Sequence, residues 1–359
     1  MKNHWWKALG VIILLYTFTA GMLLPLKPGI VAVNPSAVRT GDTVTLSVQG
    51  YNSFYTQSKT PVRAWLKLDE QRALAAKDIK ILSDNALRVS FDIPAHLPVS
   101  RRVQDFTLLL DNDVDGASVL PSALLVTQDS IQPDRGEALW VNSPITDLHE
   151  KSGITFPFRN ILAETIRNTY FHVALWFAML FLFIGGVSSS VRYLAKNDLD
   201  ADYRAQAQTT VGLIFGLLGL ITGIIWARNT WGAGYKFWNL REVDVKQAMT
   251  MVALFVYLAY FVLRMAFEDA ERKARLSAVY NIFAFVALIP LIYVVPRLTD
   301  SLHPGSGGNP ALGGEDLDNT MRMIFYPAII GWTLLGFWMA QLYYRLIKAQ
   351  MHLEERVGG

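Results

Sequence analysis

Six long apolar stretches constrain this chain more than any other feature of its sequence. A helix needs about 20 mostly apolar residues to cross the hydrocarbon core of a bilayer. Six segments meet that requirement: residues 8–26, 169–190, 209–227, 247–263, 277–295 and 323–344. Their interiors hold no lysine, aspartate or glutamate, as expected where water cannot solvate a charge. The sequence therefore predicts an α-helical polytopic membrane protein with six transmembrane helices.

Composition excludes several classes of protein. The chain is 52% hydrophobic and 18% charged, whereas soluble domains carry about 25% charged residues, so an ordinary soluble enzyme is excluded. The net charge of +3 is too small to indicate a nucleic-acid partner. The chain has no cysteine, which excludes disulfides, thiolate metal sites and covalent haem attachment. Spans without carboxylates also argue against an ion-coupled transporter.

Basic residues near the spans predict the orientation, because cytoplasmic loops carry an excess of lysine and arginine. One side, with both termini, holds twelve such residues: Lys2, Lys7, Arg192, Lys196, Arg204, Arg264, Arg272, Lys273, Arg275, Arg345, Lys348 and Arg356. The other side holds six: Arg228, Lys236, Arg241, Lys246, Arg297 and Arg322. We therefore expect cytoplasmic termini and a first span that is an uncleaved anchor rather than a signal peptide.

The segment between the first two spans has the pattern of a β-sandwich. Apolar and polar residues alternate in 44–48, 62–68 and 87–93, two further runs lie at 106–110 and 123–126, and turn residues separate them. We predict an inserted periplasmic domain that resembles an immunoglobulin-like module. The expected organisation is a 1–29 anchor, a 30–127 β-sandwich, a 128–166 connector, a 167–350 five-helix membrane domain and a 351–359 cytoplasmic tail.

Residues 111–116 (DNDVDG) look like the first half of an EF-hand loop. The twelfth position of such a loop is Ser122 here, where calcium binding requires a bidentate glutamate. We therefore interpret this segment as a polar hairpin turn.

Three features lie two spans apart, and therefore on one face of the membrane. His172 begins the second span, an aromatic segment from Trp226 to Arg241 joins the third and fourth spans, and His303 follows the fifth. Histidines can be axial haem ligands, aromatic rings offer flat apolar surfaces, arginine can pair with propionates, and Gly232 permits close backbone approach. Each residue also has a simpler interpretation, as part of an interfacial aromatic belt or a contact with lipid phosphate.

These motifs resemble the CcmC family, the haem-handling membrane proteins of cytochrome c maturation that share a tryptophan-rich loop with CcmF and CcsA. The matching runs are 170–172 (YFH), 222–226 (TGIIW), 230–232 (TWG), 238–241 (WNLR) and 301–306 (SLHPGS). Asn239 stands where the family usually has aspartate, and Tyr235 stands where it has tryptophan. The large β-domain is also an insertion relative to the family.

The resemblance implies a haem carrier of the bacterial inner membrane rather than an enzyme. Haem b would be held transiently and without a covalent bond at the periplasmic face, its iron between His172 and His303. The cofactor-binding residues would also include Trp226, Trp231, Gly232, Tyr235, Trp238, Asn239 and Arg241. Implied partners are a CcmE-like haem chaperone, the CcmA/CcmB ABC transporter and a CcmD-like small protein.

Three alternatives stay open at this point. The chain could be a haem lyase or synthetase of the CcmF or CcsA type, although those usually have more spans or further histidines. A b-type cytochrome is disfavoured because neither histidine lies deep in a span. A scaffold or sensor without haem would bind no pigment. The β-domain either docks the haem chaperone or is a spacer.

Overall fold

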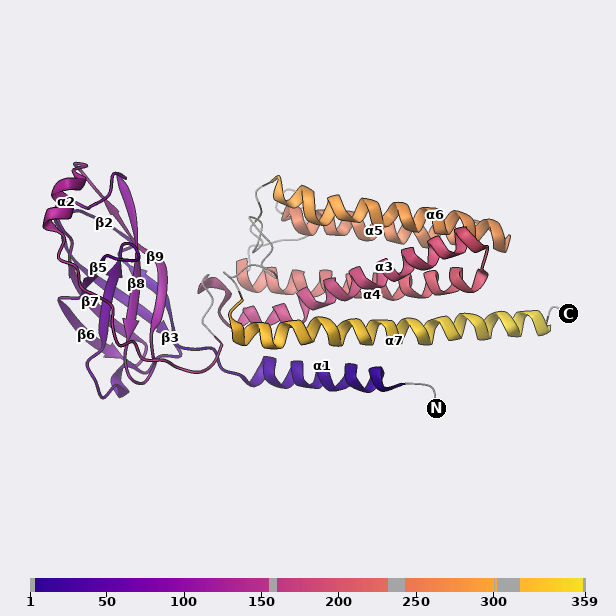
Figure 1. The fold of residues 1–359 in the computed structure, drawn as a ribbon, viewed down its shortest axis with the longest axis horizontal. Coiled ribbons are helices and arrows are strands. Elements are labelled where there is room, and N and C mark those ends of the chain that lie inside the picture. Colours follow the sequence, from indigo (N-terminus) through magenta and orange to yellow (C-terminus); the bar gives the residue numbers. More distant parts are fainter. Residues whose placement is uncertain (1–3, 155–159, 232–242, 300, 302–316, 358–359) are drawn as a thin grey trace. The chain divides into compact units, whose positions relative to one another are not determined.

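The structure is a computed structural model that describes residues 4–154, 160–231, 243–299, 301 and 317–357 (Figure 1). Contacts within the chain define two compact units. One contains residues 1–23 and 165–359, and the other contains residues 24–164. We refer to them as the helical unit and the β unit.

The helical unit contains the six predicted spans within its described ranges, which confirms a multi-pass membrane protein. Its helices are α1 (Trp5–Leu23), α3 (His172–Lys196), α4 (Leu199–Trp231), α5 (Val245–Met265), α6 (Ala270–Ile289) and α7 (Asn319–Val357). A 3-10 helix, η2 (Asn160–Tyr170), precedes α3, and short irregular turns η3 (Pro290–Val294) and η4 (Val295–Arg297) continue α6. Figure 1 shows α3 and α4 in the middle, with α5 and α6 on one side and α1 and α7 on the other.

A ladder of glycines joins α3 to α4. A Cβ atom on any of four α4 glycines would lie within 3.0 Å of an α3 side chain, so only glycine permits the observed approach. The pairs are Gly212 with Phe183, Gly216 with Met179, Gly219 with Trp176, and Gly223 with His172. Small residues are typical where membrane helices pack closely, since lipid provides no hydrophobic drive for association. The ladder sets the register of the two central helices.

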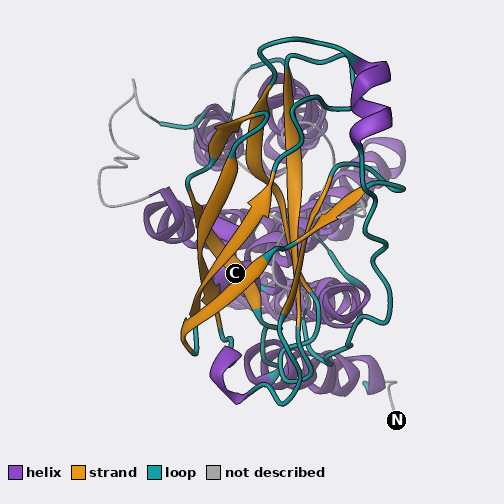
Figure 2. Cartoon of the chain, turned by 90° about the vertical axis from the view of Figure 1, so that its left-hand side faces the viewer, coloured by secondary structure: helices purple, strands orange, loops and turns teal. Residues whose placement is uncertain are grey.

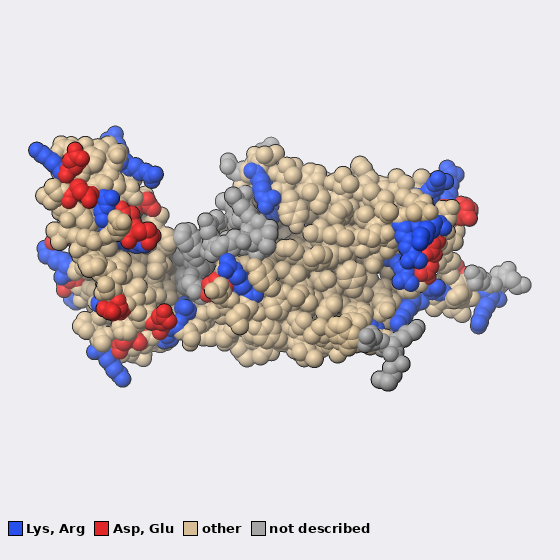
Figure 3. All heavy atoms as spheres, viewed as in Figure 1, with Lys and Arg blue, Asp and Glu red and all other residues tan. Residues whose placement is uncertain are grey.

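Charged side chains of the helical unit gather at the helix ends. Figure 3 shows a broad band without lysine, arginine, aspartate or glutamate along the helices, and blue and red patches beyond it. This is the distribution expected of helices that cross a hydrocarbon layer. The N-terminus of α1 and the C-terminus of α7 lie toward the same end (Figure 1).

One charged pair is nevertheless buried between two of these helices. Arg264 belongs to the last turn of α5, and both guanidinium NH₂ groups donate to the Asp202 carboxylate of α4 at 2.7 and 2.8 Å. Gln206 and Tyr260 also contact the guanidinium at 3.0 and 3.3 Å. The fourth span was predicted to end at residue 263, whereas α5 includes Arg264, because these partners let the charge remain inside the helix.

The described residues of the β unit contain nine strands, one short α-helix and a 3-10 turn. The strands are β1 (Gly29–Asn34), β2 (Ala37–Arg39), β3 (Thr43–Tyr51), β4 (Arg63–Lys67), β5 (Ala73–Ala75), β6 (Asp78–Ser83), β7 (Ala86–Asp92), β8 (Val103–Asp111) and β9 (Ser118–Thr127). A 3-10 turn, η1 (Tyr55–Gln57), follows β3, and helix α2 (Pro133–Leu139) follows β9. The five predicted strand runs correspond to β3, β4, β7, β8 and β9. The other four strands, β1, β2, β5 and β6, had not been predicted; β2 and β5 have three residues each, and β6 is mostly exposed.

The strands form two sheets that share one core (Figure 2). One sheet has the order β1-β3-β7-β6, and the other has the order β2-β9-β8-β4-β5. Among the named strands of the described residues, β2 pairs parallel with β9, and the other pairs are antiparallel. Alternate residues of β3 and β7 are buried, and they meet Leu66, Phe106 and Leu108 from the second sheet in the core.

The carboxylates of residues 111–116 face separate partners. Asp111 is fully buried and accepts bonds from the Arg63 side chain at 3.1 Å and from the His149 ring at 2.9 Å. Asp113 accepts from the Ser58 hydroxyl at 2.6 Å, and Asp115 from the Phe54 amide at 3.0 Å. Because they do not converge on one point, the segment is a polar turn, as predicted, and not a calcium loop.

Arg264→Leu is expected to lower the free energy of unfolding by about 3–5 kcal/mol, because it leaves the Asp202 carboxylate buried without a cation. Unfolding of the full chain in mixed SDS micelles measures this. The Arg264→Leu/Asp202→Leu double variant should recover most of the loss. Equal destabilisation of the single and double variants would contradict the role of the ion pair.

The stability of the β unit should decrease in acid through Asp111. Burial raises the pKa of this carboxyl, but hydrogen bonds from Arg63 and His149 outweigh that effect and hold the pKa below its usual value. Since the folded-state pKa is the lower one, the stabilisation is complete above about pH 5 and is lost as the pH falls through the folded-state pKa. Hydrogen exchange of residues 103–127 in the full chain measures it. The difference between wild type and Asp111→Asn should vanish in acid; a difference independent of pH would refute the assignment.

Candidate functional site

His172 is the first residue of α3, and its ring is held against α4. The ring atom Nδ1 lies 2.9 Å from the Gly219 carbonyl oxygen and 3.1 Å from the Thr222 hydroxyl. On the other side of the ring, the Trp176 indole N–H donates to Nε2 at 3.3 Å. A carbonyl oxygen can only accept and an indole N–H can only donate. The contacts therefore define a neutral imidazole with its proton on Nδ1 and its lone pair on Nε2.

This arrangement is the one found for histidines that bind metals. A ligating imidazole usually donates its second N–H to a carbonyl or carboxylate, which fixes the tautomer and makes the free nitrogen more basic. In His172 the Gly219 carbonyl provides that acceptor. Nε2 therefore carries the lone pair, which the Trp176 N–H contacts, and it is the ring atom that can act as a ligand.

Two residues beside His172 had not been singled out from the sequence. Trp176 follows His172 by four residues and packs edge-on to it, with ring centroids 6.0 Å apart. A Cβ atom on Gly223 would lie 2.7 Å from the imidazole Cε1 atom, so the missing side chain at this position leaves the space that the ring occupies. The i, i+4 spacing of His172 and Trp176, and of Gly219 and Gly223, is the signal that could have revealed them.

Two predicted tryptophans, Trp226 and Trp231, lie at the C-terminal end of α4, just after Gly223. The Trp226 side chain is buried and meets Trp231 edge-on, with ring centroids 5.5 Å apart. The hydroxyl of Thr230 lies 3.4 Å from that of Thr165, in the segment that leads into α3. The helix end that carries the aromatic residues is therefore attached to the approach to His172.

The start of α5 and the segment after α6 meet at this same end of the helices. Gln247 in the first turn of α5 lies 3.5 Å from the carbonyl oxygen of Gly223. Asp244 caps α5 by accepting from the Lys246 amide at 2.9 Å, and it also accepts from the Ser301 hydroxyl at 2.8 Å. The structure thus brings Ser301, two residues before the predicted ligand His303, to the same end of the helices as His172 and Gly223.

The remaining predicted site residues lie outside the described residues. They are Gly232, Tyr235, Trp238, Asn239, Arg241 and His303. The pairing of His172 with His303 therefore stays a prediction.

The fold and site define a six-span membrane protein that presents an oriented histidine and a tryptophan pair at one end of its helices. The family model of heme exporter protein C (CcmC) matches residues 155–357, which is more than half of the 359 residues. The chain belongs to this family, as its motifs had indicated. The match leaves residues 24–154 of the β unit outside it.

Individual relatives agree with the family match. Heme exporter protein C of Bradyrhizobium diazoefficiens is 30% identical over 174 residues, which are 48% of this chain and 62% of the relative. The Paracoccus denitrificans protein of that name is 24% identical over 192 residues, 54% of this chain and 75% of the relative. The cytochrome c biogenesis protein CcsA of Prochlorococcus marinus is 31% identical over 99 residues, 27% of this chain and 28% of the relative.

Gly223→Ala is expected to destabilise the helical unit by about 1–3 kcal/mol, because the new methyl group overlaps the His172 ring. Unfolding in mixed SDS micelles measures the loss. In a His172→Ala background the same substitution should be tolerated, since the overlapping ring is gone. Identical losses of unfolding free energy in both backgrounds would show that the imidazole does not pack against Gly223.

Proposed function

We propose that this chain carries haem in cytochrome c maturation, as a cargo that it holds and passes on. The proposal rests above all on the His172 imidazole, whose Nδ1–H is fixed by the Gly219 carbonyl and whose Nε2 carries the lone pair. The names of the relatives, heme exporter protein C and cytochrome c biogenesis protein CcsA, support haem as the cargo. We propose haem b, bound without a covalent bond, with His172 and His303 as the axial ligands.

Trp176 gives a physical reason for transient binding. Its indole N–H contacts Nε2 at 3.3 Å, so iron coordination replaces this hydrogen bond and haem release restores it. The free state is then not left with an unsatisfied ring nitrogen, which lowers the free-energy cost of release. A site whose histidine regains a hydrogen-bond partner after haem release suits a carrier better than a protein that holds haem permanently.

The aromatic residues would bind the face and edge of the ring. The Trp226–Trp231 pair provides flat apolar surface at the end of α4. In the proposed site Gly232, Tyr235, Trp238 and Asn239 continue this surface, and Arg241 pairs with a propionate. Asn239 would supply a neutral amide where the family usually has a carboxylate.

We also propose that the chain lies in the bacterial inner membrane with both termini in the cytoplasm and the β unit in the periplasm. The excess of basic residues on the side of the termini supports this orientation. The strand orders β1-β3-β7-β6 and β9-β8-β4 correspond to the A-B-E-D and G-F-C orders of immunoglobulin domains. They support an immunoglobulin-like fold for residues 30–127, with 128–166 as the connector to the membrane helices.

The proposed partners follow from the family. A CcmE-like haem chaperone would receive the haem, and the CcmA/CcmB ABC transporter and a CcmD-like small protein would assist. The β unit, which the family match does not cover, is proposed to dock the chaperone. The match to CcsA keeps a lyase-type role, in which haem is joined to the apocytochrome, as a second candidate.

Absorption spectra of the detergent-purified chain, oxidised and reduced and with added haem, test the proposal. We expect a bis-histidine haem b spectrum that weakens at least about tenfold in occupancy in His172→Ala and in His303→Ala, because each variant removes one iron ligand. His352→Ala, near the C-terminus of α7, is the matched control and should retain the wild-type spectrum.

A wild-type chain that stays colourless after incubation with haem would overturn the haem proposal and favour a scaffold or sensor. If His172→Ala alone changed the spectrum, His303 would not be the second ligand. Covalent attachment of haem to an added apocytochrome by the purified chain would favour the lyase role over the carrier role.

A further inference from the structure

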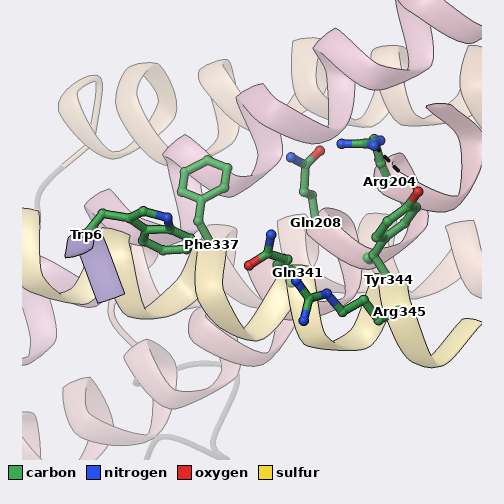
Figure 4. A pocket seen from close by; sticks show the side chains of 9 residues that line it. Trp6, Arg204, Gln208, Phe337, Gln341, Tyr344 and Arg345 are labelled. Carbon is green, nitrogen blue, oxygen red and sulfur yellow. Dashed lines mark hydrogen bonds between the residues drawn. The ribbon is translucent and has the colours of Figure 1, made fainter. Parts of the chain in front are cut away.

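A pocket of about 410 Å³ lies in the helical unit where α1 begins, and its lining is charged at one end and apolar at the other (Figure 4). It is formed by α1, α4 and α7. Its lining residues are Trp6, Arg204, Ala207, Gln208, Phe337, Ala340, Gln341, Tyr344 and Arg345. None of them belongs to the proposed haem site.

The charged end of the pocket has an excess of positive charge. Arg204 is bound to the Asp200 carboxylate at 2.9 Å and stacks over the Tyr344 ring, 4.7 Å from its centroid. Asp200 also accepts from Lys348 at 2.9 Å, so one carboxylate faces two cations. Arg345 is exposed and has no carboxylate partner in the described part of the chain. The pocket therefore favours an anionic group.

The apolar end of the pocket is suited to a hydrocarbon chain. Trp6 and Phe337 present ring surface (Figure 4), and two small apolar residues, Ala207 and Ala340, also line the pocket. Trp6 also has the Lys7 ammonium 5.5 Å from its ring, an aromatic–cation pair typical of the boundary between headgroups and acyl chains. A ligand that fits both ends is amphipathic.

One polar atom in the pocket requires a hydrogen-bond donor. The side-chain amide oxygen Oε1 of Gln341 is buried and accepts no hydrogen bond within the described ranges. Such an atom is costly to leave unsatisfied. A hydroxyl group on the ligand would satisfy it while the arginines bind the charge.

The pocket lies at the level at which a lipid headgroup would sit. Farther along the helices α1 and α7 pack tightly, since a Cβ on Gly10 would lie 3.0 Å from Leu334 and one on Gly331 would lie 2.9 Å from Ile13. The pocket therefore lies toward the end of the helical unit where both termini lie and where basic side chains gather (Figure 3). Basic pockets between membrane helices at this depth bind anionic lipid headgroups.

We propose that this pocket binds one anionic phospholipid with a hydroxyl-bearing headgroup, of the phosphatidylglycerol class. Arg345 and Arg204 bind the phosphate, the side-chain oxygen Oε1 of Gln341 accepts from the headgroup hydroxyl, and the first part of an acyl chain follows Trp6 and Phe337. Haem fits the lining poorly, since the lining holds no histidine or methionine and the Tyr344 hydroxyl already donates to Asp200.

Native mass spectrometry of the delipidated full chain in detergent, titrated with phosphatidylglycerol, tests this proposal. We expect one lipid per chain, with affinity about fivefold lower in Arg345→Gln. Arg356→Gln, on α7 but outside the pocket, is the control with the same change of charge and should bind as the wild type. Gln341→Leu should lose the preference for phosphatidylglycerol over phosphatidic acid, which lacks the headgroup hydroxyl.

Equal binding of zwitterionic phosphatidylcholine, or unchanged phosphatidylglycerol affinity in Arg345→Gln, would overturn the proposal. Saturation of the site by inorganic phosphate alone would show a simple anion site, and displacement of the lipid by haem at one molecule per chain would assign the pocket to haem; both would overturn it. His172→Ala should retain the lipid, so this result is independent of the proposed haem site.

Discussion

The close approach of α3 to α4 is the contact on which the rest of the helical unit depends. Four glycines of α4 occur at successive intervals of four, three and four residues, and the α3 side chains that they admit have the same spacing in reverse: Phe183, Met179, Trp176 and His172 face Gly212, Gly216, Gly219 and Gly223. Because each glycine leaves room for one particular α3 side chain, α3 and α4 can pack in this way in only one register. The packing that assembles the helices in lipid is therefore also the packing that orients the His172 imidazole.

The two ends of the helices use polar groups differently. At the end that carries both termini, charges are paired between helices, as in Arg264 with Asp202 and Lys348 with Asp200. At the other end, the site histidine is held by a backbone carbonyl oxygen and an indole N–H.

In the β unit, apolar–polar alternation predicts the long strands but not the short or exposed ones. Long alternating runs such as β3 and β7 were predictable because one face of each is buried. Strands β5 and β6 were not, since β5 has three residues and β6 is almost fully exposed. Likewise, the acidic run at 111–116 resembles a calcium loop until the long-range partners of Asp111, Arg63 and His149, are known.

The sequence alone determined the number of spans, because the thickness of the bilayer dictates how long an apolar helix must be. It also predicted that His172 and the tryptophan-rich segment share one face, because successive spans alternate in direction. Only the tertiary structure decided the protonated nitrogen of His172, the roles of Trp176 and Gly223, and the burial of Arg264. These depend on which residues of α3, α4 and α5 lie opposite one another, and that register arises from side-chain packing between segments as far apart as Asp202 and Arg264.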